Sequence, residues 1–270
     1  MRTSEPAAFS APDGDAAVYL ALHRRGWRWR QVAQEAGILP ATARGRDRFM
    51  CLLRHYSFRL FLRDVIKHGD DLAVALLTRY CSPAVARRYL DFLVAARLVR
   101  RLAAGRYRLC SPPVRSFGPT LEWWVAQVLA TEFGVPCVAS LRLERGAAGG
   151  DYDIIGWLEG GLLYVETKSS PPRNIDERQA LAFLRRVAAL HPDGAIFLND
   201  TQLHMAPKIV PLLRRAYRAE FGPCRLERLE REVYLLGRAV YVTNSDPDLV
   251  ANLGRCLAHR LRVRNNTARP

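Results

Sequence analysis

The sequence lacks several features that would assign a protein to a class directly. No run approaches ~18 uninterrupted apolar residues, so we expect no membrane-spanning helix. No apolar signal core opens the chain, which predicts a cytoplasmic protein. The cysteines, at positions 51, 81, 110, 137, 224 and 256, form no Cys-x-x-Cys pair. Their spacing argues against a zinc ribbon or an iron–sulfur cluster and is typical of reduced thiols.

Motifs of other enzyme classes are also missing. The six histidines occur in no His-Glu-x-x-His or His-x-Glu arrangement, so zinc-hydrolase chemistry has no support. No glycine-rich phosphate loop leads into a Lys-Ser or Lys-Thr pair, which argues against nucleotide triphosphate hydrolysis. No serine or threonine has a visible His-Asp arrangement, so covalent nucleophilic catalysis has no support either.

Lysine is scarce although positive charge is abundant. Of 41 Lys+Arg residues, only Lys67, Lys168 and Lys208 are lysines. Lysine differs from arginine in carrying a compact point charge. A lysine two residues after Glu166, in Glu166-Thr167-Lys168, therefore suggests a position that needs such a charge.

The charge is large and unevenly distributed. The formal net charge is +15 and the isoelectric point is near 10.2, which indicates a polyanionic partner. Residues 1–118 carry 21 basic against 9 acidic side chains, a net +12, and residues 119–270 carry the remaining +3. The first half is thus the part expected to hold nucleic acid. A general bias toward arginine, or a solubility effect, is the competing explanation.

Residues 150–168, GDYDIIGWLEGGLLYVETK, predict two strands joined by a tight turn. If Gly160-Gly161 is the loop, Glu159 pairs with Leu162, which sets Asp153 opposite Lys168. Side chains alternate between the faces of a strand, so Asp153, Glu166 and Lys168 converge on one patch. A three-residue loop would instead turn Asp153 to the other face.

Two carboxylates and an ammonium group suit phosphodiester hydrolysis. Carboxylate oxygens bind Mg²⁺, which keeps several waters and accepts phosphate oxygens, while a nearby lysine orients the attacking water. The alternative is an exposed cross-strand ion pair, worth ~0.2–1 kcal/mol.

An aspartate that opens one strand and a Glu-x-Lys on the next resemble the core of the PD-(D/E)XK nuclease superfamily. The resemblance implies that Asp153 and Glu166 bind metal, that Lys168 positions the nucleophile, and that Glu122, on the preceding helix, completes the site. Asp151 and Gln179 would be auxiliary residues. The literal Pro-Asp dipeptide of the family is missing. The resemblance further implies a Mg²⁺ cofactor that Mn²⁺ can replace, products with 5′-phosphate and 3′-hydroxyl ends, and a possible homodimer, because one such site cuts one strand.

Residues 57–112 resemble a winged helix-turn-helix domain. Three helices are expected over 57–69, 71–81 and 82–99, followed by a basic hairpin over 99–110. Arg87 and Arg88 on the third helix would face a groove, and arginines of the hairpin would lie near phosphates: Arg100, Arg101, Arg106 and Arg108. Protein docking is the alternative use of such a domain.

Residues 16–56 predict short helices over 16–26, 27–37 and 42–56, with Gly26 and Gly37 at helix ends. They resemble a helix-turn-helix in which Arg44, Arg46 and Arg48 reach phosphates. A helical arm that packs on the neighbouring domain is the equal alternative.

The sequence therefore predicts an α+β/α/β protein: a flexible N-terminus (1–15), a helical region (16–56), a winged-helix domain (57–112), a linker (113–118) and a restriction-endonuclease-like domain (119–270). The last would have the order αβββαβ and a mixed central sheet. The expected function is a metal-dependent endonuclease on duplex DNA, in defence, mobile-element or recombination processes. Two alternatives stay open: a non-catalytic nucleic-acid-binding regulator on an inactive nuclease fold, and a nuclease for RNA or single-stranded DNA, for which four tryptophans are candidate stacking platforms: Trp27, Trp29, Trp123 and Trp124.

Overall fold

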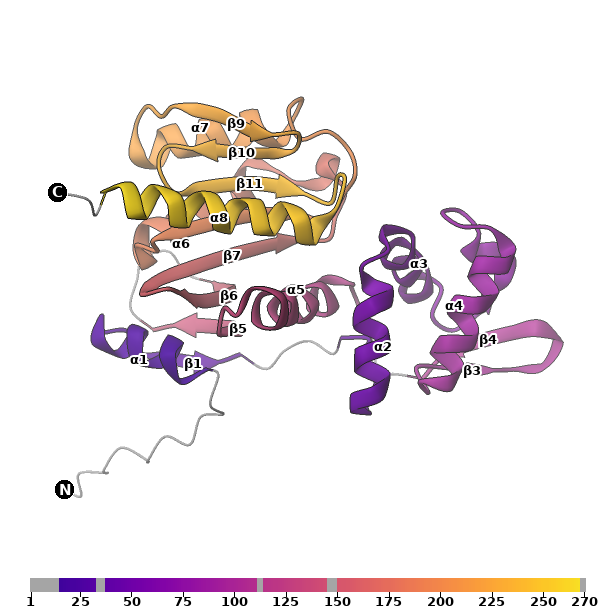
Figure 1. Cartoon of the computed structure of the whole chain (residues 1–270). Coiled ribbons are helices and arrows are strands. Elements are labelled where there is room, and N and C mark those ends of the chain that lie inside the picture. Colours follow the sequence, from indigo (N-terminus) through magenta and orange to yellow (C-terminus); the bar gives the residue numbers. More distant parts are fainter. Residues whose placement is uncertain (1–14, 33–36, 111–113, 145–149, 268–270) are drawn as a thin grey trace, which may run out of the picture.

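The structure is a computed structural model that describes residues 15–32, 37–110, 114–144 and 150–267. It is a mixed α/β fold built on a large mixed sheet, with a group of helices and a small sheet beside it (Figure 1). The expected flexible N-terminus, apart from Asp15, lies outside the described residues, as do the first residue of the expected linker and residues 33–36.

The large sheet has the strand order β1-β5-β6-β7-β8-β11-β10-β9. Strands β7, β8 and β11 run parallel to one another, and the other neighbours are antiparallel. The mixed sheet expected from the sequence is thus confirmed. Its strands are β1 (Trp29–Gln31), β5 (Cys137–Leu143), β6 (Asp151–Leu158), β7 (Gly161–Lys168), β8 (Gly194–Asn199), β9 (Leu226–Glu230), β10 (Val233–Leu236) and β11 (Val240–Asn244).

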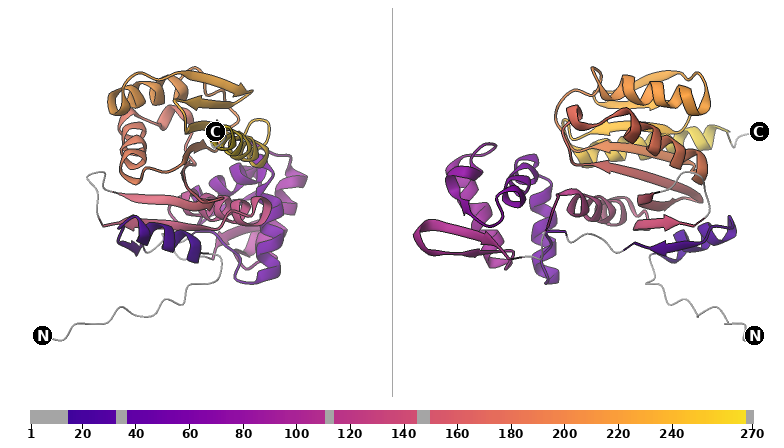
Figure 2. Two further views of the ribbon diagram at one scale, coloured as in Figure 1. Left: turned by 60° about the vertical axis from the view of Figure 1, so that its left-hand side comes forward. Right: turned by 180° about the vertical axis from the view of Figure 1, so that it is seen from behind.

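Helices cover both faces of this sheet, because its central strands are apolar on both sides. One face packs against α5 (Gly118–Phe133) and α8 (Leu249–Thr267), around the fully buried Trp124. The other packs against α1 (Ala16–Arg24), α6 (Glu177–Leu190) and α7 (Ile209–Phe221), around Tyr164 and Phe183. Figure 2 shows the two helical layers from other sides.

The prediction of a helix over 27–37 is wrong at its start. Residues Trp29–Gln31 form β1, which pairs antiparallel with β5 at the edge of the large sheet. The Trp-Arg-Trp-Arg alternation has the period of a strand: Trp29 packs in the core beside Tyr19, with ring centroids 5.3 Å apart, while Arg30 is exposed. The segment 16–32 therefore packs on the large sheet and forms no helix-turn-helix with the helix that follows.

Residues 43–109 lie beside the large sheet (Figure 1). We call these residues the helical region, which differs from the range 16–56 expected from the sequence. The helix expected over 71–81 is also wrong, because residues 72–73 pair with β4 and only one 3₁₀ turn follows before Ser82 caps the next helix. The elements are α2 (Ala43–Leu53), α3 (Tyr56–Lys67), β2 (Leu72–Ala73), η1 (Val74–Leu77), α4 (Pro83–Ala95), β3 (Val99–Arg101), η2 (Ala103–Gly105) and β4 (Arg106–Leu109), with sheet order β2-β4-β3.

A buried ion-pair group joins this helical region to the sheet. Arg59 and Arg63 of α3 contact the carboxylate of Asp200, which directly follows β8, at 2.9 and 2.6 Å. Arg59 and Asp200 are almost completely buried, so the charges are compensated within the protein rather than by water. Ser245, after β11, donates a further hydrogen bond to Asp200 at 2.6 Å. Helix α3 is thereby fixed at the ends of β8 and β11.

Candidate active site

The β6–β7 hairpin carries the predicted acidic residues, but its turn differs from the expected one. Leu158 pairs with Gly161, so the two-residue loop is Glu159-Gly160 and not Gly160-Gly161. Both loop residues have positive φ, 44° and 88°, as a type I′ turn requires. The pairing shifts by two positions, and its continuation sets Asp153 opposite Glu166 instead of Lys168. Because the register differs by two residues, each side chain stays on the expected face of the hairpin. Asp153, Glu166 and Lys168 are therefore still on one face.

Glu166 is the centre of the group. It is 1% exposed, and Lys168 and Arg186 both donate to its Oε1, each at 2.7 Å. Arg186, on α6, also reaches Oε2 at 2.8 Å, where the Tyr164 hydroxyl donates as well. Burial alone raises the pKa of Glu166, but Lys168 and Arg186 outweigh it and hold the pKa below its ordinary value. Glu166 is therefore an ionised carboxylate whose orientation is fixed by three donors.

Asp153 lies beside this carboxylate and is held by the strand that follows. Its Oδ2 accepts the Thr167 backbone N–H at 2.7 Å and the Thr167 hydroxyl at 3.2 Å. Burial raises the pKa of Asp153 well above its ordinary value, and the charges of Glu166 and Glu122 raise it further. The three carboxylates thus repel one another, and a bound cation would relieve that repulsion.

Glu122 reaches the same group from the first turns of α5. Its Oε2 accepts a hydrogen bond from the Ser140 hydroxyl on β5 at 3.2 Å, where Ser140 has a left-handed φ of 55°. Burial raises the pKa of Glu122, as do the charges of Glu166 and Asp151. Helix α5 and strands β6 and β7 therefore bring together four residues predicted from the sequence: Glu122, Asp153, Glu166 and Lys168.

The two auxiliary residues have other contacts. Asp151 forms an ion pair with Arg142 on β5, at 2.5 Å, at the edge of the group. Gln179 completes a capping box at the start of α6, where its Oε1 accepts the Asp176 backbone N–H at 3.2 Å. The capping box gives Gln179 a structural role at the start of α6.

The predicted DNA-contacting arginines lie on α4 and the β3–β4 hairpin. Arg87 and Arg88 are exposed on α4. Arg100 and Arg108 are exposed and directly opposite each other across the hairpin, and Arg108 also donates to the Asp70 carbonyl at 3.3 Å. Arg101 contacts Asp91 at 3.6 Å and Arg106 contacts Asp71. Arg46 donates to the Pro40 carbonyl at 3.0 Å, and Arg48 lies over the Phe92 ring.

Arg186 is the site residue that the sequence interpretation missed. It follows Phe183 by three positions and precedes Leu190 by four, so helical periodicity places it with the buried residues of α6. An arginine on the apolar face of a helix needs an anionic partner, and this spacing is the signal that would have pointed to one. Burial lowers the pKa of Arg186, but Tyr164 and Glu166 outweigh it and raise the pKa.

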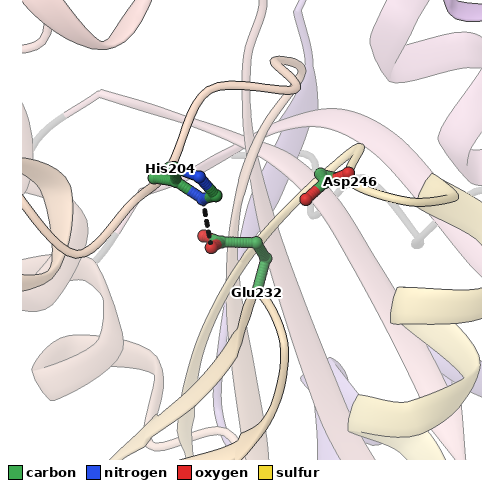
Figure 3. Close-up of side chains that lie close together, drawn as sticks. All are labelled: His204, Glu232 and Asp246. Atoms are coloured by element: carbon green, nitrogen blue, oxygen red, sulfur yellow. Dashed lines mark hydrogen bonds and ion pairs between the residues drawn. The ribbon is translucent and has the colours of Figure 1, made fainter.

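The donor set at Asp153 fits Mg²⁺. This ion is bound through one or two carboxylates and keeps several waters, and it does not require an all-protein cage. Asp153 and Glu122 are carboxylates whose charge is unfavourable without a cation. Among the described residues, the carboxylates of Glu122, Asp153 and Glu166 lie farther apart than the only three ligand atoms within 4.8 Å of one another, which belong to His204, Glu232 and Asp246 (Figure 3). There Arg231 already contacts Asp246 at 3.0 Å, and the Met205 N–H donates to Glu232 at 2.9 Å.

No protein-family model matches the sequence, and no curated protein matches it. Two solved structures share the fold. One is Can2 from Sulfobacillus thermosulfidooxidans in complex with cyclic tetra-adenylate, with 12% identity and a TM-score of 0.54; the match covers 87% of this chain and 59% of that one. The other is protein VC1899 from Vibrio cholerae, with 13% identity, a TM-score of 0.50 and coverage of 87% and 60%. The chain thus spans less than two thirds of either protein, and the likeness is one of fold.

None of the described helices has the length and apolar character that a membrane span needs.

Proposed function

We propose that this protein is a metal-dependent endonuclease of the PD-(D/E)XK type that hydrolyses phosphodiester bonds of DNA. The observation that carries the proposal is the contact between Lys168 and Glu166, 2.7 Å, next to two further carboxylates whose pKa values are raised. A structural ion pair needs only two partners. Three mutually repelling carboxylates beside one lysine are costly to a fold and are typical of a catalytic site.

Each residue has a distinct role in this proposal. Asp153 and Glu166 would hold Mg²⁺, with Glu122 as a further ligand or a support for its water. In the metal-free protein both Glu166 oxygens accept from Lys168, Arg186 or Tyr164, so metal binding would require one of these donors to give way. When bound, Mg²⁺ supplies charge compensation for the phosphate and activation of the attacking water. Lys168 would orient that water, since its ammonium group already contacts the Glu166 carboxylate at 2.7 Å. Arg186 and Tyr164 fix the orientation of Glu166 from the α6 side.

The helical region would hold the DNA. Its arginines on α4 and the β3–β4 hairpin are exposed or half-exposed, and Arg100 and Arg108 face each other without an acidic residue between them. Like charges that face each other across a hairpin are unfavourable, and a bound anion would relieve that repulsion. A phosphate backbone is the anion that the net charge of +15 favours.

Nicking of supercoiled plasmid tests the proposal. We expect nicking with Mg²⁺ or Mn²⁺, none with EDTA, and a loss of at least about 100-fold in Lys168→Ala. Lys67→Ala is the matched control, because Lys67 is exposed on α3 and lies outside the site. Equal nicking by wild type and Lys168→Ala would overturn the proposed mechanism. Binding of DNA with no nicking by any form would favour the non-catalytic regulator instead.

A further inference from the structure

A cleft of about 740 Å³ has Ser169, the neighbour of Lys168 in the chain, as one of its lining residues. It lies between α3, the loop after β7 and the loop after β8. Thr201 and Leu203 also form part of its wall. Sites that bind small molecules typically have ~300–1,000 Å³, so this cleft has room for a nucleotide. No residue of the proposed catalytic group lines it.

Two tyrosines line the cleft. Tyr56 begins α3 and Tyr80 follows η1, and 40% of Tyr80 is exposed. An arginine guanidinium lies over each ring: Arg59 at 5.3 Å from the Tyr56 centroid and Arg79 at 5.1 Å from the Tyr80 centroid. Aromatic rings with adjacent cations are the usual platform on which single-stranded nucleic acids stack their bases.

The cleft also contains polar atoms that lack partners. Asp64 Oδ2 and Arg63 Nε are buried, and no described residue forms a hydrogen bond with either. Both residues line the cleft. Burial raises the pKa of Asp64 above its ordinary value, although the nearby charges of Arg79, His68, Lys67 and Arg63 act in the opposite direction. The two buried atoms lie behind the wall, but Asp64 as a whole is only partly buried and lines the cleft, so its carboxylate can accept a hydrogen bond from a bound ligand.

A nucleobase presents donors and acceptors side by side on one edge. Tyr56, Leu60 and Asp64 are spaced by four residues on α3 and all line the cleft, over about 12 Å at 1.5 Å per residue. The same wall therefore offers a stacking ring and a hydrogen-bonding carboxylate. A base inside an intact duplex cannot reach such a wall, because its edges are paired and its faces are stacked.

We propose that this cleft binds an unpaired nucleotide of the substrate DNA, stacked on a tyrosine and hydrogen-bonded to Asp64, next to the bond that is cut. This inference rests on the proposed nuclease function and narrows its substrate to DNA with an unpaired or flipped base near the cut.

The test is binding of a fluorescent probe in EDTA, where no cleavage occurs. The probe is a DNA duplex with one bulged 2-aminopurine, and the reference duplex carries the same base fully paired. We expect the full-length protein to bind the bulged probe about 5–10-fold more tightly, as one or two hydrogen bonds and stacking predict. We also expect 2-aminopurine fluorescence to change only with the bulged probe.

Asp64→Ala and Tyr56→Leu should each remove most of this preference, while Asp70→Ala, an exposed carboxylate outside the cleft, should keep it. Melting temperatures identify any variant that has not folded, and the two cleft variants serve as independent tests. Equal affinity of the wild type for the two probes would overturn the proposal. So would an equal preference for the bulged probe in Asp64→Ala and Asp70→Ala. Because the assay needs no metal, it separates failure of the cleft from failure of the nuclease, which plasmid nicking reports.

Discussion

The backbone N–H of Asp200 donates to the carbonyl of Lys168 at 2.8 Å, while the Asp200 carboxylate is held by Arg59 and Arg63 of α3. Asn199 donates to the same Lys168 carbonyl at 3.0 Å. The backbone of the proposed catalytic lysine is thus connected through one buried aspartate to the helical region. A change at Asp200 should therefore affect both stability and activity.

We expect Asp200→Asn to lower the free energy of unfolding by about 3–5 kcal/mol, because two arginines lose their buried counter-charge. Burial alone raises the pKa of Asp200, but Arg59 and Arg63 outweigh it, so the folded pKa lies below the usual 3.8. The ionised carboxylate therefore stabilises the fold above that value, and this contribution is lost as the pH falls through the folded pKa. Urea unfolding from pH 2 to 7 measures it.

The matched control is Asp193→Asn, whose ion pair with Arg25 is about 39% exposed on the aspartate side. It should change stability little at any pH. If wild type and Asp200→Asn had the same free energy of unfolding at neutral pH, the buried ion-pair group would not provide the stability assigned to it.

Arg186→Met should destabilise the protein by about 3 kcal/mol, because Glu166 is left buried with Lys168 as its remaining cation. Nicking should fall as well, since the Glu166 carboxylate loses the donor that fixes both oxygens. Arg186→Lys keeps the charge without the fork geometry and should be intermediate. Chemical denaturation and plasmid nicking measure the two effects. If Arg186→Met matched Arg185→Met, whose arginine is 57% exposed, the support of Glu166 by α6 would be refuted.

Glu159→Asn should stabilise the β6–β7 hairpin. Glu159 has a φ of 44° and precedes Gly160, and Asn-Gly is the sequence that type I′ turns prefer. We expect a gain of about 0.5–1 kcal/mol in the free energy of unfolding, measured by denaturant titration. Glu177→Asn, on the exposed first turn of α6, is the comparison and should give no gain. A loss of stability in Glu159→Asn would contradict the strain assigned to Glu159 in this turn.

Arg100→Ala should weaken binding to duplex DNA and reduce the slope of log affinity against log salt by about 1, as loss of one phosphate contact predicts. Arg101→Ala is the neighbouring control, because Arg101 is already paired with Asp91 and should change the slope less. Fluorescence anisotropy from 50 to 300 mM KCl, roughly the range over which such slopes are measured, compares them. Identical slopes for wild type and Arg100→Ala would exclude the β3–β4 hairpin from the interface.

The local parts of the site were predictable because they follow from short-range rules. Glu166 and Lys168 are two residues apart on one strand, so alternation alone places them on one face, and they are in contact at 2.7 Å. The presence of a hairpin over 151–168 follows from strand composition and a glycine-containing turn. The register of this hairpin could not be predicted, since both Glu159-Gly160 and Gly160-Gly161 can form a two-residue loop.

Features that depend on distant partners were not predictable in the same way. Strand β1 exists because it pairs with the edge of β5, more than 100 residues later, and β9 and β10 extend the opposite edge. Arg186 enters the site only because α6 lies across the β6–β7 face. Such contacts are set by how elements pack, which no local pattern records. The nuclease and winged-helix assignments are still predictions from resemblance.

In the proposed function, Asp153 belongs to a cation-binding catalytic group, and its buried carboxylate lowers the stability of the metal-free fold. Burial and the charges of Glu166 and Glu122 raise its pKa, so its ionised form destabilises the metal-free fold as the pH rises above the unfolded value. Asp153→Asn keeps an acceptor for Thr167 and removes the charge. At neutral pH without metal, its melting temperature should therefore rise, by ~2–4 °C for each kcal/mol gained.

The most direct measurement is plasmid nicking by wild type and Asp153→Asn with Mg²⁺, using protein whose raised melting temperature shows that it is folded. We expect rapid nicking by the wild type and nicking at least about 100-fold slower by Asp153→Asn. Nicking by Asp153→Asn at the wild-type rate would contradict the proposed role of Asp153.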